Sequence, residues 1–441
     1  MRCALAAGAL SLSCLAALSA HIQSPAAYLS YAQASAVFAA LGEPAPPASD
    51  WSRWIAAADA ATRARVAGGD ETSIVNLVLF GTSFTSQPRV TSQQLNAGGI
   101  GALVERRIRD FERAVAQPGH NERLQFARRV LDDRVPVRTR LLSMIDRSMK
   151  EGETHARLMD RAHALGDPSL EFAERSRVYR DRGLASDTSI RVNFALEDAL
   201  RRAYAAARGR PAVRHVAVIG PGLDVIDKQD GYDFYPPQTI QPFAIVDSLI
   251  RLGIADARTV RVATFDVSSR VNDHIASMVD RARAGSPYML HLPLDASVEW
   301  TPAMLDYFRG FGDKVGSAVP ATVPPRLGPL RLRAVAVRPD VVARVSAHDV
   351  NITAQMARLN DGDRFDLVIA TNIFVYYDRL QQGLAMASVA GMMRPGALLL
   401  SNNALIEVPA TRIRSIGYSK MMYSNREEDG DLIVWYQKAL E

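Results

Sequence analysis

Residues 214–224, RHVAVIGPGLD, constrain the fold more than any other stretch of this chain. Four apolar residues at 216–219 lead directly into Gly220, Pro221 and Gly222. An unbroken apolar run has no face for solvent, so it favours a strand buried in the centre of a parallel sheet. Two glycines after such a strand allow a tight turn and let a ligand approach the backbone closely. The pattern predicts a ligand site at the end of this strand, although a plain structural turn explains the same residues.

From residue 212 onward, apolar strand-like runs alternate with helical patterns, which is typical of a parallel α/β domain. The expected strands are 214–220, 259–267, 331–337, 342–348, 365–371 and 396–402. The expected helices between them are 238–253, 272–284, 351–359 and 378–392. The segment 286–328 is less regular and is interpreted as an insertion. The last apolar runs, 413–425 and 431–437, predict a terminal antiparallel hairpin.

The order of three segments resembles the class I S-adenosylmethionine-dependent methyltransferases. These segments are the glycine loop, FDLVIATNIFVYYD at 365–378 and MMRPGALLLSN at 392–402. The resemblance extends over about 212–437, and TNIFVYYD is similar to the glutamate methyltransferases that modify chemotaxis receptors. It implies a Rossmann-like doubly wound α/β sheet with a C-terminal antiparallel hairpin. It also implies S-adenosylmethionine as the cofactor.

The resemblance implies a set of cofactor-binding residues at the carboxyl ends of the strands. They are Gly220, Pro221, Gly222, Asp224, Asp266, Asp349, Val350 and Thr371. Asp266 follows a strand and suits the ribose hydroxyls, while Asp349 and Val350 suit the adenine ring. The family's third glycine and early acidic residue are missing here, and Asp224 is the candidate replacement. Asp266 as a turn residue and Asp349 as a helix cap remain alternative interpretations.

Two further residues, at and just after the end of the FDLVIATN strand, are candidates for catalysis. Asn372 ends the strand and presents a carbonyl at the rim of the expected pocket, and Tyr376 and Tyr377 follow within reach. Methyl transfer at a sulfonium needs alignment and a site for positive charge, which carbonyls and aromatic faces supply. The resemblance implies an oxygen or nitrogen nucleophile of a small molecule or a protein side chain as acceptor. Packing at a helix start explains Tyr376 equally well.

The insert at 227–241, DKQDGYDFYPPQTIQ, follows the glycine loop directly. We interpret it as a flap over the cofactor or as a wall of the substrate site. Its aspartates have no spacing typical of a metal-binding loop, so no metal is expected. The insertion at 286–328, with His291, Trp300 and Tyr307, is the expected substrate-recognition element.

The first half of the chain has a different character. Residues 22–170 are predicted to form a mainly α-helical domain with arginine-rich, solvated faces. Residues 171–211 connect it to the methyltransferase-like domain, 212–441. The connection is interpreted as a linker, or as a lid that packs over the cofactor.

Composition limits the choice of partners and compartment. Only 22% of the 441 residues are charged, and the net charge of +5 comes without a basic block interleaved with aromatics, so no nucleic acid is expected. Residues 1–20 resemble a signal peptide and are short for a membrane span, so no stable span is expected in the mature chain. Export, for instance to the periplasm, is therefore predicted, with a cytoplasmic location as the alternative. The oligomeric state is not indicated.

These observations fit three possible functions to different degrees. The first is methyl transfer from S-adenosylmethionine. The second is an exported, non-catalytic binding protein or pseudo-enzyme on the same fold, which the altered glycine motif favours. The third, a nicotinamide-dependent oxidoreductase, is disfavoured because Val225 occupies the third glycine position of GxGxxG.

Overall fold

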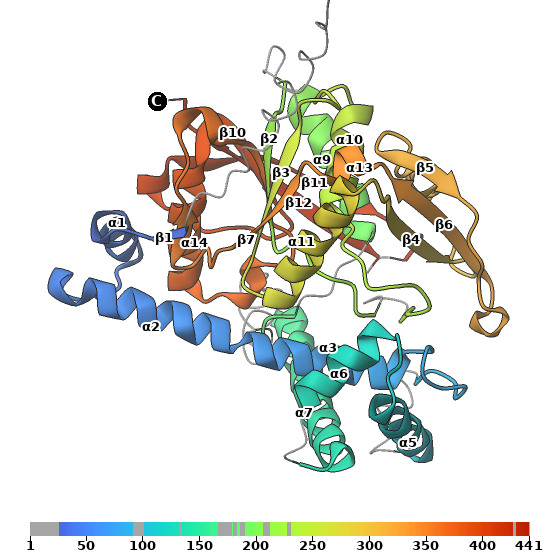
Figure 1. Cartoon of the computed structure of the whole chain (residues 1–441). Coiled ribbons are helices and arrows are strands. Elements are labelled where there is room, and N and C mark those ends of the chain that lie inside the picture. Colours follow the sequence, from blue (N-terminus) through green and yellow to red (C-terminus); the bar gives the residue numbers. More distant parts are fainter. Residues whose placement is uncertain are drawn as a thin grey trace, which may run out of the picture.

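The computed structural model describes residues 26–90, 101–131, 135–165, 179, 183–185, 190–205, 212–226, 231–426 and 429–440. The predicted signal peptide at 1–20 lies outside the described residues. Figure 1 shows an α/β body with a set of helices gathered along one edge of its central sheet. The architecture is thus mixed α/β, as the strand pattern predicts.

A seven-stranded, mostly parallel sheet forms the centre of the body. Its order is β11-β12-β10-β9-β2-β3-β7. The parallel strands are β2 (His215–Ile219), β3 (Arg261–Asp266), β7 (Val345–Asp349), β9 (Phe365–Ile369) and β10 (Met393–Ser401). Taken in chain order, they stand in space as 3-2-1-4-5, the arrangement of a doubly wound sheet. The order reverses between β2 and β9, which makes that junction the topological switch point.

The edge beyond β10 is antiparallel. Strand β12 (Gly430–Lys438) pairs with β10, and β11 (Ile413–Met422) pairs with β12. The sheet therefore ends in two strands that run against the parallel set.

Helices cover both faces of this sheet, which explains the unbroken apolar run in β2. Val216 and Val218 pack with α9 (Arg191–Ala205), α10 (Gln241–Arg251) and α11 (Ser269–Arg283). Ala217 and Ile219 point to the opposite face and pack with α14 (Arg379–Met392). Successive side chains of a strand alternate between the two faces, so every position of β2 is buried.

The prediction that 331–337 belongs to the main sheet is wrong. Strand β6 (Leu330–Val337) lies between β4 (Tyr288–Asp295) and β5 (Gly316–Val319) in a separate antiparallel sheet. All eight residues of β6 find partners on β4, and β7 takes the place beside β3 instead. Helix α12 (Pro302–Gly310) joins β4 to β5, and α13 (Pro339–Val342) leads into β7. The insertion therefore folds into a small antiparallel sheet with a helix between two of its strands.

The predicted helix at 351–359 is also wrong. The side chain of Asn351 accepts hydrogen bonds from the backbone N–H and the hydroxyl of Thr353, which fixes a turn. Such side-chain bonds compete with the helical pattern. Strand β8 (Gln355–Ala357) follows and pairs antiparallel with β1 (Ala26–Tyr28) from the start of the described chain.

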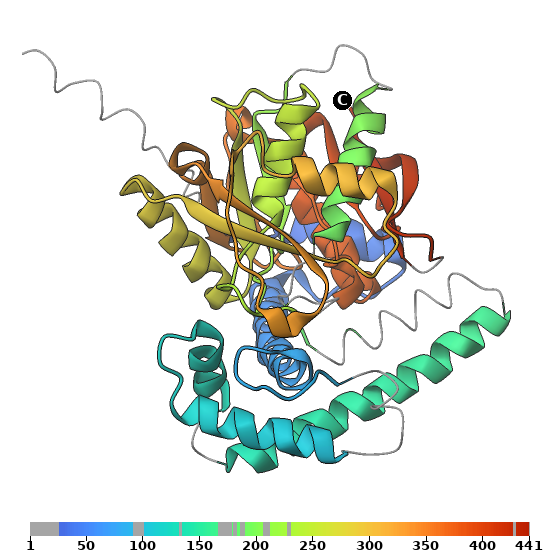
Figure 2. The same cartoon turned by 90° about the vertical axis from the view of Figure 1, so that its right-hand side faces the viewer.

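The N-terminal half divides between two packing partners. Helix α1 (Tyr31–Leu41) and the start of α2 (Trp51–Ala64) pack on the α/β body beside α14. Further helices form a cluster of their own: α3 (Val66–Phe80), α5 (Ala102–Ala116), α6 (Glu122–Leu131) and α7 (Val137–Leu165). Short 3-10 helices lie at Ala48–Asp50, Pro325–Leu327, Asp361–Asp363, Phe374–Tyr376 and Pro409–Thr411. In Figures 1 and 2 the α3, α5, α6 and α7 group lies beneath the body, with α2 leading to it.

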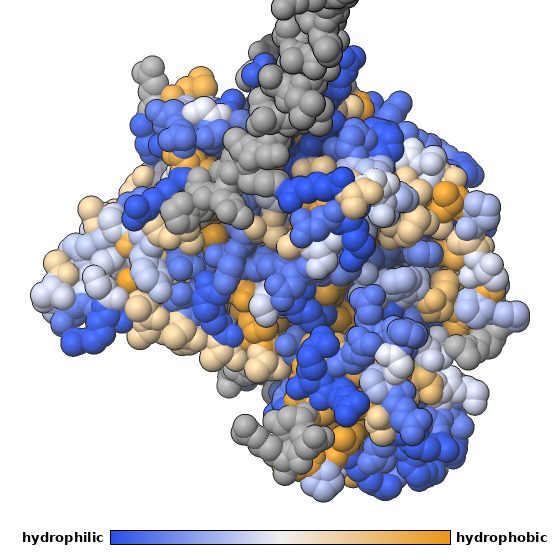
Figure 3. Space-filling model, viewed as in Figure 1, coloured by the Kyte–Doolittle hydropathy of each residue, from blue (hydrophilic) through white to orange (hydrophobic). Residues whose placement is uncertain are grey.

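The outer surface is mainly hydrophilic on the face drawn in Figure 3, with apolar residues in small groups. Such scattered groups are ordinary for a globular protein. Within the described residues, no helix is long and apolar enough to cross a membrane.

Candidate functional site

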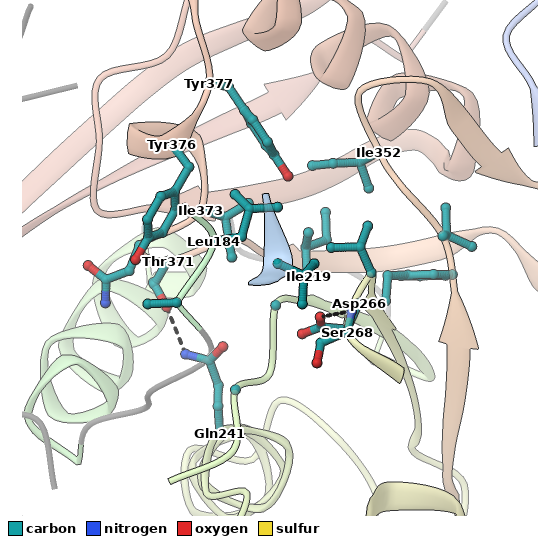
Figure 4. A pocket seen from close by; sticks show the side chains of 18 of the residues that line it. Leu184, Ile219, Gln241, Asp266, Ser268, Ile352, Thr371, Ile373, Tyr376 and Tyr377 are labelled. Atoms are coloured by element: carbon teal, nitrogen blue, oxygen red, sulfur yellow. Dashed lines mark hydrogen bonds between the residues drawn. The ribbon is translucent and has the colours of Figure 1, made fainter. Parts of the chain in front are cut away.

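A pocket opens at the carboxyl ends of the parallel strands, beside the switch point. The space free of protein atoms is about 810 Å³, counted out to the solvent at its mouth. Residues at the ends of β2, β3 and β9 line it, together with the residue after β7; they include Ile219, Gly220, Gly222, Phe265, Asp266, Val350, Thr371 and Asn372. Figure 4 shows labelled side chains from different segments, among them Ile219, Asp266 and Thr371, around one hollow. Ligands of doubly wound sheets bind in this position.

The glycine loop after β2 needs glycine for its backbone. Gly220 and Gly222 both have positive φ angles, +63° and +72°. A Cβ on Gly220 would lie 2.0 Å from Cδ1 of Ile373, so a side chain cannot be added without moving that wall. Gly220 lines the pocket, but its backbone N–H donates to the carbonyl of Phe265 and is not directed at a ligand. Pro221, predicted to bind the cofactor, does not line the pocket.

Asp266 stands at the end of β3 and borders the pocket. Its Oδ1 accepts a hydrogen bond from the amide of Ser268 at 2.8 Å. Burial raises the pKa of this carboxyl to about 6, against the lowering effect of the Ser268 amide and of Arg270. A carboxylate that is poorly hydrated is stabilised by any hydrogen-bond donor that a ligand supplies.

Asp349 is the β7 partner of Asp266 in the sheet but has another role. Its Oδ1 accepts a hydrogen bond from Nη1 of Arg63 on α2 at 2.5 Å. It does not line the pocket, whereas the following residue, Val350, does. This corrects the expectation that the Asp349 carboxylate faces the cofactor: its partner comes from 286 residues earlier in the chain.

Asp224 is likewise placed away from the pocket. Only 1% of it is exposed, and its Oδ2 accepts hydrogen bonds from the hydroxyl of Tyr235 and the amide of Gln238. Its backbone pairs with that of Gln238 as well. These contacts hold the segment after the glycine loop in place, so Asp224 does not replace the missing acidic residue.

Thr371 follows β9 and lines the pocket. It is held in place by Gln241, a residue that the sequence did not indicate as part of the site. Its hydroxyl accepts a hydrogen bond from Nε2 of Gln241 at 2.8 Å, and that nitrogen also reaches Asn193 at 3.4 Å. Figure 4 shows the carbonyl oxygen of Gln241 on the pocket side. Gln241 is the first residue of α10, the helix that follows the glycine loop, and this position is the sequence feature that points to a place near the ligand.

Asn372 is held by a reciprocal pair of hydrogen bonds. Its amide N–H donates to Oδ1 of Asn402, and Nδ2 of Asn402 donates to its Oδ1, both at 2.7 Å. Its φ is +58°, a conformation that asparagine tolerates better than most residues. The carbonyl expected to meet a ligand is therefore already engaged, and Asn372 shapes the rim of the pocket instead.

Tyr376 and Tyr377 both border the pocket, but they differ in orientation. In Figure 4 the hydroxyl of Tyr377 points into the hollow, while that of Tyr376 points to its side. Burial, and then the charge of Asp266, raise the pKa of Tyr377, which keeps the hydroxyl protonated. Tyr377 is thus a better candidate for contact with a ligand than the predicted Tyr376, which packs edge-on against Tyr179.

The N-terminal half supplies one wall of the pocket. Val66, Leu184 and Ala185 line it. The amide of Leu184 donates to the carbonyl of Arg65 at 3.0 Å, and Nη2 of Arg65 donates to the carbonyl of Tyr376 at 2.7 Å. Of the connection at 171–211, residues 179, 183–185 and 190–205 are described, and its role as a linker or as a lid stays a prediction.

In the described part of the insert after the glycine loop, 231–241, the last residue, Gln241, lines the pocket, and residues 231–240 do not. Residues 227–230 lie outside the described residues. Asp233 is buried and accepts hydrogen bonds from Thr82 and Ser83, which anchors the insert to the helical half. The predicted recognition residues Trp300 and Tyr307 are buried at other contacts, beside Arg191 and Phe194. The described residues contain no cluster of three or more metal-ligating side chains.

Comparisons with known proteins give only distant likenesses. No protein-family model matches the chain, and no curated protein matches it. The N-methyltransferase NodS from Bradyrhizobium japonicum WM9 is 10% identical, with a TM-score of 0.28, over 55% of this chain and 94% of its own. The glycopeptide N-methyltransferase MtfA is 12% identical, with a TM-score of 0.28, over 57% of this chain and 94% of its own.

Magnesium protoporphyrin IX methyltransferase (ChlM) from Synechocystis PCC 6803 is 10% identical, with a TM-score of 0.26, over 64% of this chain and 96% of its own. The narrower resemblance to chemotaxis-receptor methyltransferases is not supported by these likenesses.

Proposed function

We propose that this chain binds S-adenosylmethionine in the pocket at the sheet edge and transfers its methyl group to an oxygen or nitrogen nucleophile. The main support for this proposal is the way in which three strands meet at one pocket. Asp266 ends β3, while Gly222 and Thr371 follow the ends of β2 and β9, and all three line a single pocket beside the switch point. In doubly wound sheets this is where nucleotide-like cofactors bind.

The residues at the centre of the pocket fit the polar parts of that cofactor. The positive-φ glycines keep side chains out of the loop after β2, so a ligand can approach the backbone. Asp266 follows the neighbouring strand and can accept hydrogen bonds from two ribose hydroxyls. The side-chain carbonyl of Gln241, which lies on the pocket side in Figure 4, suits the ammonium group of the methionine part.

The remaining walls fit a flat heterocycle. Phe265, Val350 and Ile352 line the pocket beside Asp266. Apolar side chains around a few placed polar groups are typical of small-molecule sites. Val350 thus remains a candidate for the adenine subsite, without the help of the Asp349 carboxylate.

When bound, the cofactor supplies an electrophilic methyl group whose bond to sulfur breaks as the bond to the nucleophile forms. The chain has to align the two partners and exclude water. Val66, Leu184 and Ala185 close one side of the pocket with apolar groups, and the Tyr377 hydroxyl faces its interior. We propose that the acceptor is a small molecule or a protein side chain, brought to the rim formed by Asn372.

Calorimetry with S-adenosylhomocysteine tests this function without knowledge of the acceptor. We expect one site per chain and binding at micromolar concentrations. Gly222→Trp should abolish binding because the indole would occupy the pocket. Gly253→Trp is the matched control, since Gly253 also has a positive φ but has open space around it. Retained helical circular dichroism in both variants shows that the fold survives. Absence of binding to the unmodified chain would refute the proposal.

A further inference from the structure

A second hollow lies between helix α6 and helix α11, outside the pocket described above. We name it the α6–α11 groove. Its space free of protein atoms is about 2020 Å³, counted out to solvent. Residues Leu223 and Ser269 line it, while their chain neighbours Gly222 and Ser268 line the first pocket. The two hollows therefore lie on opposite sides of the same two chain segments.

Guanidinium groups enter this groove from both helices. Arg123 and Arg129 come from α6, and Arg270 and Arg281 from α11. Arg270 is neutralised by an ion pair with Asp70 at 3.3 Å. Arg129 and Arg281 are exposed, and within the described chain neither forms an ion pair.

Arg123 is unusual because it is buried without a carboxylate. It is 4% exposed, and its donors meet the backbone carbonyls of Val225 and Tyr235. Its Nη2 is buried and has no hydrogen-bond partner. The Arg123 guanidinium also lies over the Tyr235 ring, 5.5 Å from its centroid. Carbonyl dipoles and an aromatic face do not cancel the full charge of a buried cation, which favours a negative group nearby.

His274 adds a neutral polar ring to the same wall. The Tyr288 hydroxyl accepts a hydrogen bond from the amide of Thr239, and its oxygen is hydrogen-bonded to Nε2 of His274 at 2.8 Å. Burial, and then Arg281 and Arg270, lower the pKa of His274 to about 4, so the ring is neutral at pH 7. The charges that act on this ring are both positive.

The rest of the groove is largely apolar. Phe126, Val130, Pro236, Pro237 and Met289 line it, and Met289 is 38% exposed. Carboxylates are present too, but Asp70 is taken by Arg270, and Glu122 and Asp273 are exposed. An apolar lining with unpaired guanidinium groups suits a ligand that has an apolar body and an anionic group.

From this arrangement we infer that the α6–α11 groove is a second binding site, which takes an organic anion with an aromatic or apolar body. The anionic group meets Arg129 and Arg281, and the body packs on Phe126 and Met289. The site is separate from the pocket at the sheet edge, so the inference does not depend on the proposed methyl transfer.

Two fluorescent probes of nearly the same shape test the charge requirement. The anionic probe is 8-anilinonaphthalene-1-sulfonate, and the neutral one is N-phenyl-1-naphthylamine. We expect the sulfonate to bind the full chain at one saturable site, about tenfold more tightly than the neutral probe, as one charge-assisted contact implies. Equal affinities, or no saturable binding of the sulfonate, would overturn the inference.

Variants locate the probe. Arg281→Glu and Arg129→Glu should each weaken sulfonate binding by at least about tenfold, the effect of losing one charge-assisted contact. Arg283→Glu is the matched control, because Arg283 lies on the same helix but pairs with Asp280 outside the groove. An equal loss in this control would show a mere effect of net charge. Saturating S-adenosylhomocysteine should not displace the sulfonate, and one-for-one displacement would place the probe in the first pocket instead.

Discussion

Arg63 on α2 holds the carboxylate of Asp349 at the end of β7, with 2.5 Å between Nη1 and Oδ1. The same guanidinium donates to Asp59 and to Gln355, so it ties the helical half to the sheet edge. Asp266, the register partner of Asp349 on β3, forms no ion pair within the part of the chain that the structure describes, and it borders the pocket. Two carboxylates that look equivalent in the sequence therefore have different roles.

Replacing each of these carboxylates should separate the two roles. Asp266→Asn removes a charged acceptor from the pocket, and we expect S-adenosylhomocysteine to bind about tenfold or more weakly, the cost of one charge-assisted hydrogen bond. Asp349→Asn should leave the affinity nearly unchanged because its side chain lies outside the pocket. Calorimetry on both variants makes the comparison. A larger loss in Asp349→Asn would reverse the assignment.

Binding should depend on pH through Asp266. Its pKa of about 6 means that the carboxylate is mostly protonated at pH 5 and mostly ionised at pH 7.5. Only the ionised form accepts from two hydroxyls without competition, so affinity should rise about tenfold between these pH values, following the ionised fraction. The slope should vanish in Asp266→Asn. A slope that persists in this variant would implicate another group.

The raised pKa of Asp266 also affects the free energy of unfolding, and this effect runs in the opposite direction with pH. Because burial raises the pKa of Asp266 above its unfolded value, the folded state binds the proton more tightly. The contribution of this group to the free energy of unfolding should therefore increase as the pH falls from about 6 to about 4, the window between the two pKa values. Urea unfolding of the ligand-free chain and of Asp266→Asn, at both ends of this window, measures the difference.

Gly220→Ala should disturb the pocket through Ile373. The added Cβ meets the Ile373 side chain at 2.0 Å, and the positive φ adds backbone strain. We expect a loss of about 2 kcal/mol or more in the free energy of unfolding, since both overpacking and strain contribute. Gly253→Ala carries the strain without the clash and should cost less. If Ile373→Ala does not restore part of the loss in the double variant, the clash is not the cause.

The pair formed by Asn372 and Asn402 should matter for stability. Asn402→Ala removes two hydrogen bonds and leaves Asn372 at a positive φ without support, for which we expect a loss of about 1 kcal/mol. Asn372→Gly relieves the backbone strain, so the double variant should lose less than Asn402→Ala alone. Chemical denaturation of the three variants provides the numbers. Equal losses in the single and double variants would exclude strain at Asn372.

The strands of the parallel core were predictable because burial on both faces leaves a local signal. Residues 216–219 are all apolar because alternate side chains enter two different cores. The glycines of the loop could also be read from sequence, since their positive φ is a local property. Gln241 was missed because a single amide at a helix start carries no chemical pattern.

The remaining features depend on contacts between distant segments. The sequence suggests that the Asp349 carboxylate faces a ligand, because nothing near it in sequence reveals its partner Arg63, 286 residues away. Strand β6 resembles a parallel strand, and only its long register with β4 places it in another sheet. The turn at Asn351 competes with a helix, and β8 is completed by residues 26–28, which no local pattern indicates.

We propose that the cofactor lies in the pocket between the glycine loop and Asp266, and a crystal structure of the chain with S-adenosylhomocysteine would locate it. We expect the ligand in this pocket, with its ribose hydroxyls at hydrogen-bond distance from the Asp266 carboxylate and its amino-acid part beside Gly222 and Gln241. Density for the ligand at another place on the chain, or a ribose that makes no contact with Asp266, would contradict it.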